Sequence, residues 1–240
     1  MAKLTSQQQL DRITTWLTSV LGSRLQALVL YGSAAGSEPR GHRSDHNLLA
    51  VVDAVSAGLL DDLAPAQLWW AKQGNPPVVV LSQDEQKASC DVFPIEYLDI
   101  QRQHRLLAGA DVFSVISSHP ELHRLQVEHD LRTQLIRLRS NYALVRQYSR
   151  RLESLLLDSI STFLVLFRHA LVAAGEPWPA SRGEALAAAA RRFQFSSDAC
   201  QTLLAAHRNH GHLPKTQLHS LFAQYLDSIQ RVERGLEELA

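Results

Sequence analysis

The hydrophobic pattern of the 240-residue chain changes near residue 118, and this change constrains the fold more than any other feature. Before that point short apolar runs alternate with helical patterns, whereas beyond it the apolar residues have helical spacing. Strands that alternate with helices are typical of an α/β layer with a mixed sheet, and consecutive helices are typical of a bundle. We therefore expect an α+β domain over residues 1–117, followed by an all-helical bundle over 118–240 that binds substrate or forms a dimer.

The pattern also predicts the individual elements. The first domain is expected to hold helices over 10–21 and 59–72 and strands over 27–31, 47–52, 77–81 and 92–98. In the second domain we expect helices over 121–151, 152–174, 182–194, 197–209 and 215–239.

The helix expected over 152–174 contains the most membrane-like stretch of the chain, residues 155–174. It carries Asp158, Arg168 and His169, whose charges are costly inside a bilayer, so we interpret it as a buried helix of the bundle.

Composition excludes several classes of protein. The chain has 24 Lys and Arg against 24 Asp and Glu, which argues against a polybasic protein that binds membranes or long nucleic acids. The neutrality is a cancellation, because the net charge is −3 over residues 1–117 and +3 over 118–240. Cys90 and Cys200 are far apart, and the first residues contain no apolar signal region. These features predict a cytoplasmic protein without disulfides.

A small-residue turn follows the first predicted strand. Leu30-Tyr31 leads into Gly32-Ser33, where a strand is expected to turn into a helix. Backbone N–H groups at such a turn can bind phosphate oxygens, because glycine permits close approach and a helix N-terminus favours anions. A turn of this composition is more often only a turn, so its phosphate-binding role depends on what lies nearby.

Three polar residues on later strands provide that context. In the second predicted strand Asp45 and Asn47 share one face while His46 points to the other. Glu96 interrupts the apolar run of the fourth predicted strand, and Asp99, near the end of that strand, is the simpler surface alternative. Carboxylate and amide oxygens beside a phosphate-binding turn are suitable ligands for Mg²⁺. We therefore expect Asp45, Asn47 and Glu96 to form a metal site.

Together, Gly32-Ser33, the Ser44-Asp45-His46-Asn47 segment and a later acid resemble the polymerase-β-type nucleotidyltransferase superfamily, particularly its small bacterial, kanamycin nucleotidyltransferase-like members. The similarity extends to Leu106–Phe113, which looks like the segment that closes such domains. The resemblance implies that Gly32, Ser33 and Ser44 bind a nucleoside triphosphate, with ATP as the expected one. It also implies that Asp45 and Glu96 are catalytic and hold two Mg²⁺ ions together with Asn47, and that the nucleotide binds between the two domains.

Asn47 departs from the family pattern, because the family has a second Asp at this position. An amide offers an oxygen without charge, so we expect a weaker metal site. Two functions remain open. One is Mg²⁺-dependent transfer of a nucleoside monophosphate to a hydroxyl of a small molecule or protein. The other is a catalytically weak or inactive nucleotide-binding module that acts by association, for example as a homodimer.

Other residues invite weaker interpretations. The histidines of the 207–212 segment match no dedicated zinc pattern and are more simply a solvated helix end. Arg132, Arg139 and Arg146 share a helix face that is either solvated or directed at phosphates. Arg124 and His129 have the spacing of a ribonuclease motif, which chance explains as well. The tryptophans Trp69, Trp70 and Trp178 are most simply core or hinge residues.

Overall fold

The structure is a computed structural model that describes residues 4–35, 45–114 and 119–239 of the chain, and for Ser33 the backbone only. The chain forms two structural units, Met1–His119 and Pro120–Ala240, which are described separately. The first unit is an α+β layer with a small mixed sheet, and the second is helical, so the predicted fold class is confirmed.

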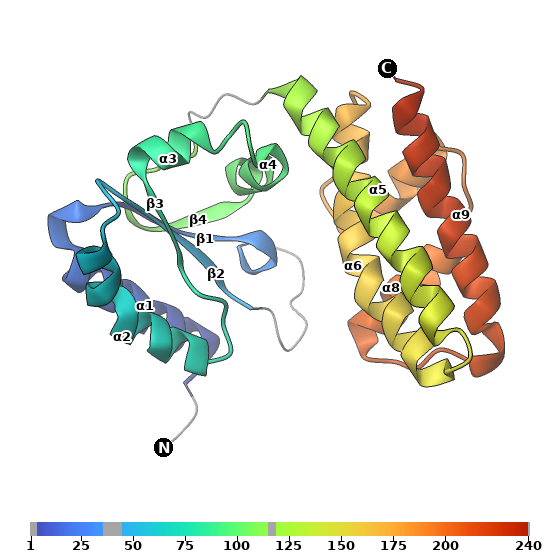
Figure 1. The fold of residues 1–240 in the computed structure, drawn as a ribbon, viewed down its shortest axis with the longest axis horizontal. Coiled ribbons are helices and arrows are strands. Elements are labelled where there is room, and N and C mark those ends of the chain that lie inside the picture. Colours follow the sequence, from blue (N-terminus) through green and yellow to red (C-terminus); the bar gives the residue numbers. More distant parts are fainter. Residues whose placement is uncertain (1–3, 36–44, 115–118, 240) are drawn as a thin grey trace. The chain divides into compact units, whose positions relative to one another are not determined.

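The sheet of the first unit has four strands in the order β3-β2-β1-β4 (Figure 1). They are β1 (Leu25–Tyr31), β2 (Asn47–Val52), β3 (Val79–Ser82) and β4 (His104–Gly109). The central strand β1 is antiparallel to both β2 and β4, whereas β2 is parallel to β3. The alternating side chains of β1 and β2 are apolar on both faces, so each face of the sheet requires a covering layer.

Helices α1 (Ser6–Leu21) and α2 (Ala57–Lys72) cover one face of this sheet, and α4 (Pro94–Arg102) covers the other (Figure 1). The first face contributes Leu28, Leu30, Leu48, Ala50 and Val52 to a core that includes Ile13, Leu17 and Trp70. The second face contributes Ala27, Val29, Leu49 and Val51, which pack against Tyr97, Ile100 and Phe113. From Ala27 onward, the odd-numbered residues of β1 and β2 therefore point toward α4, whereas Leu25, before the irregularity in β1, packs on the other side.

The predicted strand over 92–98 is wrong, because this segment begins helix α4. Pro94 occupies the first turn of the helix, where its fixed φ and missing N–H are tolerated. The fourth strand is β4, which overlaps the start of the segment compared above with the family's closing segment. A short apolar run does not distinguish a strand from a buried helix. Helix α3 (Gln83–Ala88) was also not predicted, although Ser82 and Glu85 form a capping box at its start.

The second unit contains helices α5 to α9. They are α5 (Pro120–Val145), α6 (Ser149–Ala173), α7 (Arg182–Arg192), α8 (Asp198–Asn209) and α9 (Leu218–Glu237). Helix α6 is central, since it packs against each of the other four. Helix α5 ends six residues before its predicted end and α6 begins three residues before its predicted start, with Tyr148 at the N-cap position of α6.

Helix α6 passes the length and composition test for a membrane span in the described part of the chain, with a mean hydropathy of 1.6 over its most apolar window. Half of that window is buried within the structure, and core helices pass the same test. Leu152, Leu156, Ile160 and Phe167 are fully buried against neighbouring helices. The prediction that this helix has a buried face in the bundle is confirmed.

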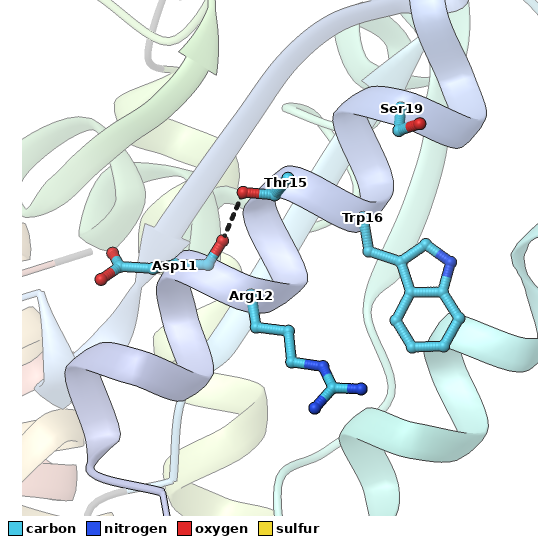
Figure 2. Close-up of a pocket in the computed structure, with 5 residues that line it drawn as sticks. All are labelled: Asp11, Arg12, Thr15, Trp16 and Ser19. Carbon is cyan, nitrogen blue, oxygen red and sulfur yellow. Dashed lines mark hydrogen bonds between the residues drawn. The ribbon is translucent and has the colours of Figure 1, made fainter.

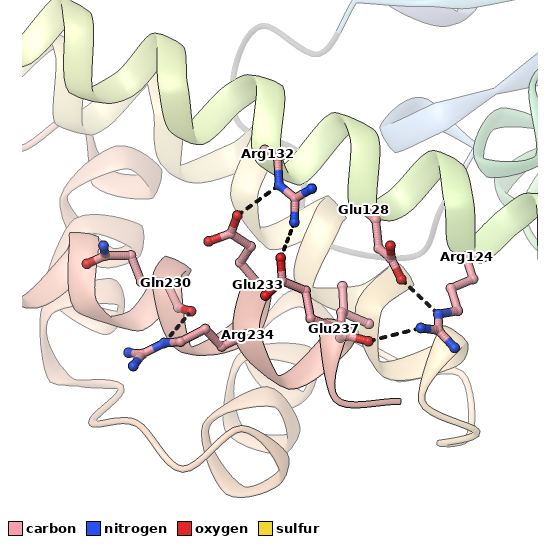
Figure 3. A network of polar contacts seen from close by, with 8 residues as sticks. Arg124, Glu128, Arg132, Gln230, Glu233, Arg234 and Glu237 are labelled. Carbon is pink, nitrogen blue, oxygen red and sulfur yellow. Dashed lines mark hydrogen bonds and ion pairs between the residues drawn. The ribbon is translucent and has the colours of Figure 1, made fainter. Parts of the chain in front are cut away.

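Two ion-pair groups join α5 to α9 (Figure 3). The Arg124 guanidinium donates to Glu128 Oε1 at 2.8 Å and to the carbonyl oxygens of Leu236 and Leu239 at 3.3 and 2.8 Å. Arg132 donates to Glu233 Oε1 at 3.1 Å and also pairs with Glu237. Because carbonyls at a helix C-terminus lack intrahelical partners, Arg124 satisfies the end of α9. Both arginines therefore have a structural role within this unit.

Cys200 is a sensitive probe of the folding of the second unit. It is fully buried in α8, and burial raises the pKa of its thiol to about 12. Since the thiolate is the reactive form, about one thiol in 10⁴ is ionised at pH 8. We expect Cys200 in a Cys90→Ser variant to resist a thiol reagent under native conditions and to react fully in denaturant. Rapid labelling of the native variant would contradict this burial.

Candidate functional site

The site begins where β1 ends. Tyr31, the last residue of β1, pairs with Asn47 of β2 on one side and with His104 of β4 on the other. Gly32 follows with φ +72°, a conformation that side chains rarely adopt, and opens a single 3₁₀ turn, Gly32–Ala34. A Cβ at Gly32 would lie 3.0 Å from Asn47 Nδ2. The turn and the Asn47 side chain are therefore in close proximity, as the sequence predicted.

Strand alternation separates Asn47 from His46. Asn47 is half-buried and precedes Leu49 and Val51 on the α4 side of the sheet. His46 is buried on the other side, with its ring 6.1 Å from that of Trp70. The His46 N–H donates to Asn75 Oδ1 at 3.1 Å, which holds the start of β2 in place. Asp45 precedes His46 and is exposed, so its carboxylate is accessible to a ligand.

Glu96 lies in the first turn of α4 rather than on a strand, and its side chain is exposed. Burial raises the pKa of the Tyr31 hydroxyl, and the negative charge of Glu96 raises it further. The second effect places the Glu96 carboxylate within electrostatic reach of the Tyr31 hydroxyl. Glu96 therefore comes from a helix that covers the predicted side of the sheet rather than from a strand. Asp99, the alternative acid, lies half-buried one turn further along α4.

His104 is a neighbour of the site that the sequence did not indicate. Its Nδ1 lies 2.7 Å from the Ile100 carbonyl oxygen at the end of α4, and its Nε2 lies 3.2 Å from Asp111 Oδ1. Both partners are acceptors, so only the doubly protonated ring donates to both. Asp111 Oδ1 also accepts the backbone N–H groups of Phe113 and Ser114 at 3.0 and 3.2 Å. His104 thus ties α4 to the segment after β4. A histidine that opens an apolar run is the only sequence sign of it.

Two of the predicted nucleotide-binding side chains cannot be placed. The Ser44 residue and the Ser33 side chain lie outside the described part of the chain, as do residues 36–44 of the intervening loop. The backbone of Ser33 is in the 3₁₀ turn that opens at Gly32. Of the predicted site, the structure therefore positions Gly32, Asp45, Asn47 and Glu96.

The chemistry of these residues fits a single Mg²⁺ ion. Asp45 and Glu96 supply carboxylates and Asn47 supplies an amide oxygen, and all three are oxygen donors of the kind that Mg²⁺ takes. The described residues contain no cluster of three His, Cys, Asp or Glu residues positioned to hold a metal. Mg²⁺ is commonly bound by one or two carboxylates together with substrate phosphates rather than by a cage of protein groups. The donor set is compatible with that mode.

The other residues that the sequence suggested as metal or nuclease sites make structural contacts instead. His210 is in the left-handed conformation at the end of α8, and His212 lies 3.3 Å from Glu153 Oε1, so the histidine segment is a helix end as predicted. His129 is exposed and contacts Asp130. Arg124, the first residue of the Arg124–His129 pair, is bound to carbonyl oxygens at the end of α9, which leaves it unsuited to a nuclease role.

A shallow hollow of about 620 Å³ lies on α1 and is lined by Asp11, Arg12, Thr15, Trp16 and Ser19 (Figure 2). The Arg12 guanidinium lies 4.7 Å from the Trp69 ring centre, which in turn lies 6.2 Å from that of Trp16. Helix α1 covers the face of the sheet opposite to Asn47 and α4. The hollow is therefore separate from the site, and Trp69 and Trp70 belong to the packing of α1 and α2.

Comparison with known proteins identifies the fold. Neither a family model nor a curated protein matches the sequence. Among solved structures, spectinomycin adenyltransferase AAD(9) from Enterococcus faecialis, determined with ATP and spectinomycin, is similar, with a TM-score of 0.59 and 13% identity. The match covers 97% of this chain and 100% of that protein. The chain thus has a nucleotidyltransferase-like α+β fold followed by a helical region, similar to that adenyltransferase along its whole length.

Proposed function

We propose that this protein is a nucleotidyltransferase that moves a nucleoside monophosphate from a nucleoside triphosphate to a hydroxyl group of a small molecule or protein. The observation that supports this most is the close approach of the Gly32 turn to the Asn47 side chain at the end of β1. The Glu96 charge, which acts on the Tyr31 hydroxyl, adds to it. The neighbour over the whole chain is an adenyltransferase solved with ATP and spectinomycin, which favours ATP and a small-molecule acceptor here.

The turn after β1 is the proposed phosphate-binding element. Gly32 has no side chain between its backbone and Asn47, so phosphate oxygens can approach the N–H groups of the turn. Ser33 follows directly, and we propose that its hydroxyl and that of Ser44 donate to the β- and γ-phosphates. The positive end of the short turn adds a favourable potential for an anion.

Asp45, Asn47 and Glu96 are the residues proposed to hold Mg²⁺ against the α-phosphate. The ion supplies charge neutralisation for the phosphates and the leaving pyrophosphate when bound. The Asp45 carboxylate is exposed and carries the charge of the pair, while Asn47 offers an oxygen from the same face of β2. One neutral ligand among three leaves the site weaker than one built from three carboxylates.

Glu96 is the proposed general base. Its carboxylate accepts the proton of the acceptor hydroxyl as that oxygen forms a bond to the α-phosphorus. The bond from the α-phosphorus to the bridging oxygen breaks at the same time, and pyrophosphate leaves with the electron pair. Because Glu96 is exposed in the first turn of α4, it is accessible to an acceptor. Catalysis then depends mainly on positioning and electrostatics.

We further propose that the protein works in the cytoplasm, because Cys90 and Cys200 are free thiols in separate units.

The test has two stages. Thermal unfolding with ATP, GTP, CTP and UTP, each with and without Mg²⁺, reports binding and base preference together. A nucleotide at about 100 times its Kd is expected to raise the unfolding temperature by roughly 5–10 °C. Release of pyrophosphate is then measured over a panel of hydroxyl acceptors. Binding of no triphosphate under any condition would overturn the proposal.

Asn47 supports a second candidate, a nucleotide-binding module with little or no catalysis. If the site is still used, Asn47→Asp adds a charged ligand beside Gly32 and is expected to tighten Mg²⁺-dependent nucleotide binding about tenfold, since a nearby charge is worth ~1.4 kcal/mol or more. Isothermal titration with and without Mg²⁺ measures this. Asn209→Asp, an exposed position at the end of α8, is the matched control. Unchanged binding by the Asn47 variant would favour the module that has lost its metal site.

A further inference from the structure

Helix α5 has an exposed apolar face. Leu122, Leu125, Ile136 and Leu144 are 37, 64, 55 and 71% exposed. With 100° between successive residues, these four lie within about 100° of one another around the helix axis, and His129, Thr133 and Ser140 lie between them. The four side chains and the small polar residues between them form one stripe, here called the α5 stripe.

The rest of α5 is already occupied. Val127, Leu131, Leu135 and Leu138 are buried on the opposite side, where α5 packs against α6 and α9. Arg124 and Arg132 extend along that packed side to Glu128 and to residues of α9 (Figure 3). The partners within this unit are therefore used on one side of α5, and the α5 stripe is left over on the other.

The stripe is complementary to itself when two copies are antiparallel. Leu122 and Leu144 lie eleven residues on either side of Thr133, so a two-fold axis beside Thr133 places Leu122 of each copy against Leu144 of the other. Asp130 lies three residues before Thr133 and Arg137 four residues after it, both on the same flank of the stripe. The same axis therefore places Asp130 of each copy beside Arg137 of the other copy, which gives two equivalent charge pairs.

These two charges do not satisfy each other within one chain. Seven residues separate them along α5, about 10 Å, which exceeds the reach of the i,i+3 and i,i+4 pairs of a helix. Asp130 contacts the exposed ring of His129, and Arg137 is exposed and makes no ion pair with the residues that the structure describes. We infer that the protein forms a homodimer in which the α5 helices of two copies pair antiparallel through the α5 stripe.

The size of the stripe sets the expected affinity. Helix α5 has 26 residues, hence a length of about 39 Å, and a strip about 10 Å wide buries about 800 Å² over both copies. Interfaces of this size are weak and reversible. The dimer is therefore expected to dissociate in the micromolar range, and the equilibrium must be measured as a function of concentration.

Sedimentation velocity of the full chain from about 1 to about 200 µM, without nucleotide, tests this pairing across the micromolar range. The wild type is expected to shift from monomer to dimer. Asp130→Arg and Arg137→Asp each place two like-charge pairs at the interface, so each is expected to weaken dimerisation at least tenfold. The double swap restores both pairs and is expected to return the affinity to within about threefold of the wild type. Ile136→Glu is expected to abolish dimerisation.

Lys215→Asp, a charge reversal at an exposed position away from α5, is the control and should leave dimerisation unchanged. Helical circular dichroism verifies that each variant is folded. A wild type that stays monomeric to about 200 µM overturns the inference. A double swap no better than either single variant overturns the antiparallel register. Neither result bears on nucleotide binding, so this test is independent of the proposed function.

Discussion

Asp45→Asn is expected to lower the rate of nucleotidyl transfer about 10²–10³-fold, which corresponds to about 3–4 kcal/mol of lost transition-state stabilisation. Asp45 is the only charged member of the Asp45–Asn47 pair, so its replacement leaves β2 with two neutral amides at the proposed metal site. The charge that develops on the phosphates is then poorly neutralised. Pyrophosphate release at saturating nucleotide, measured across a series of Mg²⁺ concentrations, quantifies this loss.

The matched control is Asp53→Asn. Asp53 directly follows β2 at the end of the strand away from Asn47, and its carboxylate accepts the N–H of Ala54 at 2.7 Å. This variant removes the same charge next to the opposite end of β2 and is expected to retain wild-type rates. Equal activity of the Asp45 variant and the wild type would remove Asp45 from the site.

The same assay distinguishes the two acids of α4. Glu96→Gln is expected to lower the rate, since its charge is near the end of β1, whereas Asp99→Asn is expected to have little effect. The opposite order would assign the third acid to Asp99. Because both residues are in one helix, general loosening of α4 would affect the two variants alike.

Gly109→Ala is expected to destabilise the first unit by about 4 kcal/mol. Gly109 ends β4 with φ +81°, and a Cβ there would lie 2.1 Å from the Gln26 carbonyl oxygen and 3.0 Å from Ala27 Cα. These are backbone atoms of β1, so the contact is relieved only by separating the two strands. Gln26 O also accepts the Ala110 N–H at 2.9 Å, and this hydrogen bond would be lost.

Urea unfolding followed by tryptophan fluorescence measures the loss, since Trp16, Trp69 and Trp70 all belong to the first unit. Gly74→Ala is the control, because Gly74 has φ +88° but no atom within 4 Å of an added Cβ. It carries the same backbone strain without the collision and is expected to cost about 1–2 kcal/mol. If both variants lose equal stability, the close contact with Gln26 is not the cause. Cys200 labelling should remain slow in both, since Cys200 lies in the other unit.

Much of the fold follows from local sequence. The apolar runs that became β1, β2 and β3 and the long helical patterns of the second half were predicted, because their periodicity depends on neighbouring residues alone. The segment 92–98 was not, since Ile95 and Tyr97 are buried in both a strand and a short helix. Only packing of Tyr97 and Ile100 against Val29 and Val51 selects the helix. Strand β4 also depends on its non-local pairing with β1.

Some features of the candidate site also follow from the sequence, and others depend on the tertiary structure. The sequence by itself determined which chemical groups are present: Gly32 for a close approach, Asp45 and Asn47 with one residue between them, and a later acid. That Asp45 and Asn47 share one face stays a prediction from their spacing, because β2 begins at Asn47 and Asp45 precedes it. Only the tertiary structure decided that Glu96 reaches Tyr31 from α4 and that His104 and Asp111 hold α4 to the sheet. Packing within the second unit also leaves the α5 stripe exposed. These arrangements depend on how the helices and strands pack, which local patterns do not encode.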